Sequence, residues 1–184
     1  MSASDYAWVE AADQLLSALT ITLVQPDDGT ALRVLRPKSQ YPAPMTFEEA
    51  LDAAFALPAW AYKEVVVQLD SIGGWTALIE PAGWATADPD KLAQLSANGT
   101  AVSVFWNVNA HMLFGLARAG SPVRFFDPLL YSADADALPE ESEFEWGVGH
   151  PQASALGLLE RLTGVRVERD WLVGPARPTY VVSL

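Results

Sequence analysis

Two apolar segments flank a Gly-Gly pair in residues 64–80: Glu64-Val65-Val66-Val67-Gln68-Leu69-Asp70, then Ser71-Ile72-Gly73-Gly74, then Trp75-Thr76-Ala77-Leu78-Ile79-Glu80. β-Branched and aromatic residues favour strands, and a Gly-Gly pair between two such runs is typical of a tight turn. Pro81 ends the second run, because proline cannot donate a hydrogen bond to a strand ladder. These residues therefore predict an antiparallel hairpin.

Similar patterns predict the elements on either side of this hairpin. Strands are expected at 20–24, 100–107, 112–118, 122–127 and 179–183. Helices are expected at 5–18, from the Thr46 and Glu49 capping box to Pro58, and at 88–96 and 153–162. Residues 28–35 fit either a helix or a strand, and the proline-rich residues 37–44 predict a loop. We therefore expect one α+β domain over 1–184, an antiparallel sheet of about five or six strands with helices packed on one face.

Composition restricts the kinds of function to consider. The chain has no cysteine, and its formal net charge is −12 with a pI near 4.4. A surface of that sign repels phosphate backbones and anionic lipids, so we expect neither nucleic-acid nor membrane binding. The N-terminal residues lack the pattern of a signal peptide, and no apolar run is long enough to span a membrane. These features, together with the missing cysteines, predict a cytoplasmic protein.

No residue pattern indicates a catalytic site. The sequence contains neither a Gly-x-Ser-x-Gly elbow nor a glycine-rich phosphate loop. The two histidines, His111 and His150, have no neighbouring ligands at metal-binding spacing. We therefore expect no catalytic residue, no metal and no cofactor.

Acidic residues are concentrated late in the chain. Between Arg124 and Arg161 there is no Lys or Arg, whereas eight Asp and Glu residues occur there. Aromatic residues interrupt this stretch, and aromatic anchors in a negative field are suited to attracting and holding a basic partner. The leading hypothesis is a non-enzymatic protein that binds a basic protein, for example an immunity protein that neutralises a cationic toxin. Its candidate binding residues are Tyr131, Asp134, Asp136, Glu140, Glu141, Glu143 and Trp146.

Other interpretations remain open at this point. The acidic stretch could be a solvated loop that only keeps the protein soluble. A second hypothesis is a small-molecule-binding or hydrolytic protein with a pocket on the sheet, lined by Glu80, Asn107, Asn109, His111 and Asp127. The simpler interpretation is that Asn109-Ala110-His111 form a hairpin turn, in which the Asn amide bonds to nearby backbone. A third hypothesis is a structural subunit that folds only as an oligomer.

Several short motifs resemble those of a family of bacterial domains of unknown function. They are Gly73-Gly74-Trp75-Thr76, Glu80-Pro81, Gly83-Trp84, Leu95-Ser96, Gly99-Thr100, Trp106-Asn107-Val108-Asn109 and Leu162-Thr163-Gly164-Val165. The resemblance extends from Trp8 to about Trp171 and implies no activity, ligand or catalytic residue. Residues 37–44 and 127–149 depart from the family pattern, so a function peculiar to this chain is expected there.

Overall fold

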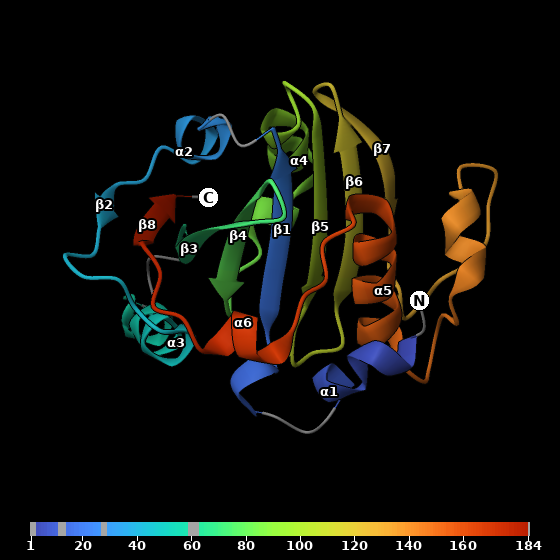
Figure 1. Cartoon of the computed structure of the whole chain (residues 1–184), viewed down its shortest axis with the longest axis horizontal. Helices are drawn as coiled ribbons and strands as arrows, with labels where there is room; N and C mark the ends of the chain where they lie inside the picture. The colour runs from blue at the N-terminus through green and yellow to red at the C-terminus, as the bar shows by residue number, and fades with distance from the viewer. Residues whose placement is uncertain (1–2, 11–13, 27–28, 59–62, 184) are drawn as a thin grey trace.

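The structure is a computed structural model that describes residues 3–10, 14–26, 29–58 and 63–183. Its strands are β1 (Leu19–Gln25), β2 (Ser39–Gln40), β3 (Glu64–Ile72), β4 (Trp75–Pro81), β5 (Thr100–Trp106), β6 (Met112–Arg118), β7 (Ser121–Phe126) and β8 (Thr179–Ser183). They form one antiparallel sheet in the order β2-β8-β3-β4-β1-β5-β6-β7, which is drawn in Figure 1. The α+β class with an antiparallel sheet is confirmed.

The predicted number of strands is wrong, because the sheet has eight strands among the described residues. The hairpin at 64–80 and the three strands between 100 and 127 lie where the sequence places them. The strand absent from the prediction is β2, whose two residues lie in the proline-rich loop and pair with β8. A strand of two residues forms only because β8, far away in the sequence, pairs with it, so no local residue pattern predicts it.

Helices cover both faces of the sheet, and the expectation of helices on one face is also wrong. The helix α5 (Pro151–Thr163) packs on the face that carries Val102 and Val104, whereas α4 (Pro89–Leu95) packs on the opposite face with Ala101. Figure 1 shows these two helices on opposite sides of the sheet. The sheet under α4 offers few large side chains as a sequence signal, because Ala101, Gly115 and Ala117 lie there; a Cβ on Gly115 would stand 2.8 Å from a methyl of Leu92.

The remaining helices are short. They are α1 (Ala7–Glu10), α2 (Thr30–Leu35), α3 (Phe47–Ala56), α6 (Arg169–Val173) and the 3-10 turns η1 (Ala3–Tyr6), η2 (Gln14–Leu16), η3 (Ala85–Ala87) and η4 (Pro139–Glu143). The predicted helix at 5–18 is thus replaced by η1, α1 and η2, and residues 11–13 lie outside the described part. The Thr46 capping box at the start of α3 is confirmed. In the described residues, no helix is both long and apolar enough to cross a membrane.

Candidate partner-binding surface

A buried arginine anchors the acidic segment, by which we mean residues 127–149. Arg124 lies on β7 with its side chain only 4% exposed, and Glu141 opposite it is fully buried. Its Nε and Nη2 donate to the two carboxylate oxygens of Glu141 at 2.8 and 3.0 Å, while Nη1 donates to both oxygens of Asp134 at 2.9 and 3.0 Å. One guanidinium therefore binds two carboxylates of the segment in bidentate geometry.

The charges of this cluster shift each other's titration. The guanidinium of Arg124 lowers the pKa of the Asp134 carboxyl, because it favours the ionised form. Partial burial, followed by the hydrogen bond with Glu141, raises the pKa of the Tyr131 hydroxyl. The hydrogen bonds to Glu141 also raise the pKa of Arg124, so the arginine stays charged.

Aromatic side chains hold the segment against the end of β7. The rings of Tyr131 and Trp146 stack with centroids 5.2 Å apart, and Phe126 contacts both rings edge-on at 5.3 and 5.0 Å. Phe126 in turn stacks on the buried Phe114 at 5.3 Å, which joins this group to the core. The indole N–H of Trp146 donates to the carbonyl of Glu141 at 2.8 Å. The segment is thus folded onto the sheet.

Backbone contacts complete the attachment. The amide of Gly147 donates to the carbonyl of Pro128 at 3.0 Å, which brings the two ends of the segment together. Asp127 accepts from the amide of Leu129 at 2.8 Å and caps the turn after β7. At the far side, Arg161 of α5 donates to Glu143 at 3.2 Å. In Figure 1 the segment lies beyond β7, beside α5.

The predicted binding residues divide into two groups. Four of them make the internal contacts that fix the segment: Tyr131, Asp134, Glu141 and Trp146. The side chains of Asp134 and Tyr131 are nevertheless partly exposed to solvent. Asp136 is exposed, Glu140 is partly exposed, and Glu143 is exposed beside Arg161. Glu145 of the same stretch is exposed as well. Binding of a partner by any of these residues stays a prediction.

Two exposed apolar side chains accompany these carboxylates, and sequence reasoning missed both. Leu130 is 78% exposed and Val148 is 98% exposed. The hydrogen bond from the Gly147 amide to the Pro128 carbonyl joins the backbone just before Val148 to the backbone two residues before Leu130. The sequence signal available was that Val148 stands between two glycines, which offer it no side chain to pack against.

The structure has a pocket where the small-molecule hypothesis expects one, but most of the predicted lining residues are not in it. A pocket of about 350 Å³ is lined by Trp84, Phe105, Asn107, His111, Met112 and Leu113. The Oδ1 of Asn107 accepts from the amides of Asn109 and His111 at 2.9 and 3.2 Å, so the hairpin turn at 109–111 is confirmed, with Asn107 as the residue that bonds to its backbone. Asp127 caps its own turn after β7. Among the predicted lining residues, Asn107 and His111 are the ones found at this pocket.

Glu80 is a structural carboxylate. It is fully buried and accepts from the amides of Ala85 and Thr86 at 2.7 Å each, and also from the Thr86 hydroxyl. Burial raises the pKa of Glu80, because a low-polarity environment disfavours its charged form. These bonds fix η3 against β4 and occupy both carboxylate oxygens. Within the described part of the chain, no three His, Asp or Glu side chains gather as metal ligands.

Comparison with known proteins gives one match. A profile described as a family of unknown function, DUF6461, matches residues 1–182. Neither the curated proteins nor the solved structures contain a significant match. The resemblance to an uncharacterised family is thereby confirmed, and it now extends over nearly the whole sequence. The chain belongs to the DUF6461 family.

Proposed function

We propose that this chain is a non-enzymatic binding protein whose acidic segment docks onto a basic surface of another protein. One observation carries the proposal: Arg124 and the aromatic rings fix the segment against the sheet, while Asp136, Glu140, Glu143 and Glu145 of the same segment stay wholly or partly exposed, as do Leu130 and Val148. Exposed carboxylates and exposed apolar side chains on one fixed segment are the parts of an interface.

The internal contacts favour tight binding. A loop that must be ordered on association loses part of its interaction free energy to conformational entropy, whereas this segment is already ordered. Seven carboxylates lie in residues 127–149 without a Lys or Arg, and Arg124 from β7 neutralises part of their charge. The remaining negative field accelerates encounter with a positively charged protein.

The apolar side chains supply affinity that charge alone does not provide. Surface ion pairs are worth roughly 0–1 kcal/mol each, because water and salt screen them. Fully burying a Val or Leu side chain gains about 1.5–3 kcal/mol. Leu130 and Val148 are therefore the expected anchors, with the carboxylates acting as the charged rim. A cationic toxin neutralised by an acidic immunity protein is one instance of such a pair.

The test uses the immobilised protein and a lysate of its source organism. A captured protein is purified, and its affinity is measured by calorimetry against the wild type and three variants. The first variant combines Asp136→Asn, Glu140→Gln and Glu145→Gln, which spares the carboxylates bound to Arg124. The second is Leu130→Ala with Val148→Ala.

The matched control removes three exposed acids elsewhere: Glu48→Gln, Asp52→Asn and Asp170→Asn. The acidic variant and the apolar variant should each weaken binding about tenfold or more, and the control less than threefold. Binding by the wild type should also weaken as salt rises. An acidic partner, or equal affinities for the acidic variant and its control, would contradict the proposal.

A second candidate function is the binding of a small apolar molecule in the pocket beside Trp84. The observation that favours it is the indole of Trp84, 49% exposed at the rim of this pocket with Phe105 and Met112. Aromatic and apolar walls with a few polar groups are typical of ligand sites. A metabolite screen followed by tryptophan fluorescence tests it, and a response that persists in Trp84→Ala would exclude this pocket.

A further inference from the structure

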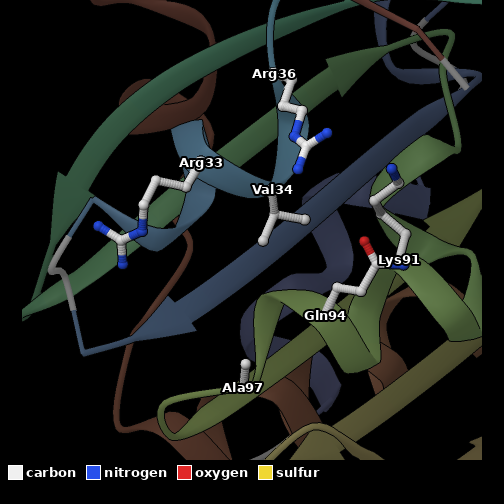
Figure 2. A pocket seen from close by; sticks show the side chains of 6 residues that line it. All are labelled: Arg33, Val34, Arg36, Lys91, Gln94 and Ala97. Carbon is white, nitrogen blue, oxygen red and sulfur yellow. The ribbon is translucent and has the colours of Figure 1, made fainter.

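A second pocket lies between α2 and α4, on the face of the sheet opposite α5. Its volume is about 430 Å³, and Figure 2 shows its lining: Arg33, Val34, Arg36, Lys91, Gln94 and Ala97. This volume falls in the range of about 300–1,000 Å³ found for small-molecule sites. The acidic segment contacts α5 and the other face, so the two regions are separate.

The pocket is basic in a strongly acidic protein. The whole chain has 11 Lys and Arg residues against 23 Asp and Glu residues, yet Arg33, Arg36 and Lys91 all line this pocket. In Figure 2 the side chains of Arg36 and Lys91 point toward each other across the pocket, whereas Arg33 points away. The Gln94 side chain extends into the pocket below Lys91.

Neither facing cation has an acidic partner in the part of the chain that the structure describes. Ion pairs there bind Lys38 to Glu64, Arg177 to Asp70 and Arg161 to Glu143, but none involves Arg36 or Lys91. Asp90, the residue before Lys91, makes no ion pair with it among the described residues, and Asp88 uses Oδ1 to accept from the amides of Asp90 and Lys91. Two facing positive charges without an anion between them repel each other.

Each of the two cations occupies a position that carries a cost. Arg36 has φ 46° and ψ 62°, a left-handed conformation that is strained for a residue with a Cβ. Strained positions of this kind recur at binding sites. Lys91 lies in the first turn of α4, where the helix dipole disfavours a positive charge. An anion in the pocket would offset the unfavourable charge of Lys91 at the helix start and the repulsion between the two cations.

We propose that this pocket binds a phosphate group. The planar guanidinium of Arg36 can donate to two phosphate oxygens, the ammonium of Lys91 and the amide of Gln94 to the others. A planar carboxylate would satisfy Arg36 alone and leave the opposite wall unpaired. Val34 and Ala97 offer apolar contact to the organic part of a phosphate ester. The site is independent of the acidic segment.

The experiment titrates the protein at constant ionic strength with inorganic phosphate, glucose 6-phosphate, adenosine monophosphate and acetate. Calorimetry gives affinities, and amide NMR shifts locate the site. Phosphate-bearing probes should shift the amides of Val34, Arg36, Lys91 and Gln94, and acetate should bind at least tenfold more weakly. Tighter binding of an ester identifies an organic phosphate as the ligand, and equal binding identifies free phosphate.

Variants then assign the affinity to the two cations. Arg36→Gly suits the left-handed backbone and removes the charge, so it should fold while phosphate affinity falls at least tenfold. Lys91→Gln should have a similar effect. The controls Lys63→Gln and Arg118→Gln remove exposed cations elsewhere and should change affinity less than twofold. No binding of any phosphate probe, acetate binding as tightly, or undiminished binding by Arg36→Gly and Lys91→Gln would overturn the proposal.

Discussion

Replacing Arg124 by Met tests whether the ion pair with Glu141 holds the acidic segment in place. The substitution keeps an apolar stem of similar length against Phe126 but leaves the Glu141 carboxylate buried without a counter-ion. Removing one partner of a buried pair typically costs about 3–5 kcal/mol. For a domain with about 5–15 kcal/mol of stability this is a severe loss.

Urea unfolding followed by circular dichroism measures that loss. With a slope of about 2 kcal/mol per molar urea, Arg124→Met should lower the midpoint by about 2 M. Trp146 emission should shift to the red in the native baseline if the segment also detaches, because its indole then leaves the ring of Tyr131. Glu145→Gln, at an exposed position of the same segment, is the control and should change stability by less than about 0.5 kcal/mol.

The double variant Arg124→Met with Glu141→Leu separates the pair's own contribution from the penalty of an orphaned charge. Replacing both members of a buried pair by apolar residues is often neutral or stabilising. The double variant should therefore recover most of the stability that Arg124→Met loses. A loss below about 1 kcal/mol in the single variant, or a double variant as unstable as the two single losses added together, would refute the reasoning.

Three further predictions concern stability. Burial raises the pKa of Glu80, so above about pH 4.5 its carboxyl binds more protons in the folded than in the unfolded state. The free energy of unfolding should therefore fall as pH rises above that value. Glu80→Gln should flatten this pH dependence in thermal melts between pH 5 and 8. Arg36→Gly should raise the free energy of unfolding by about 0.5–1 kcal/mol in urea, since glycine suits φ 46°. Gly157→Ala places a Cβ 2.5 Å from the ring of Phe144 and should cost about 1–3 kcal/mol, whereas Gly149→Ala, with no atom within 4 Å, should change the urea midpoint little.

The sequence predicts the sheet well where local patterns suffice. The hairpin turn at Gly73 and Gly74 has φ values of 58° and 82°, which glycine adopts freely, so its residues specify it directly. The second helical face was missed because Gly115 and Ala117 present little apolar surface. Their small size makes room for Leu92 of α4, and that relation becomes visible only when both elements are in place.

The sequence draws attention to the acidic segment but does not show how the segment is held in place. Arg124 entered the sequence reasoning only as the boundary of the acidic stretch, although it is the residue that fixes the stretch. The signal available was an isolated arginine between Val123 and Phe125 on a predicted strand, immediately before seven carboxylates. A cation placed on a strand that faces the core needs an anionic partner, and the following segment is the nearest source.

Charge makes the two proposed sites respond to salt to different degrees. The net charge of −12 adds long-range attraction to a basic partner at the acidic segment, and salt removes this attraction. The same net charge repels phosphate from the pocket of Arg36 and Lys91, so salt screens both that repulsion and the local attraction. Raising ionic strength should therefore weaken partner binding steeply and phosphate binding only slightly. Two associations that weaken in parallel would mean that one charged surface, rather than two separate sites, governs both.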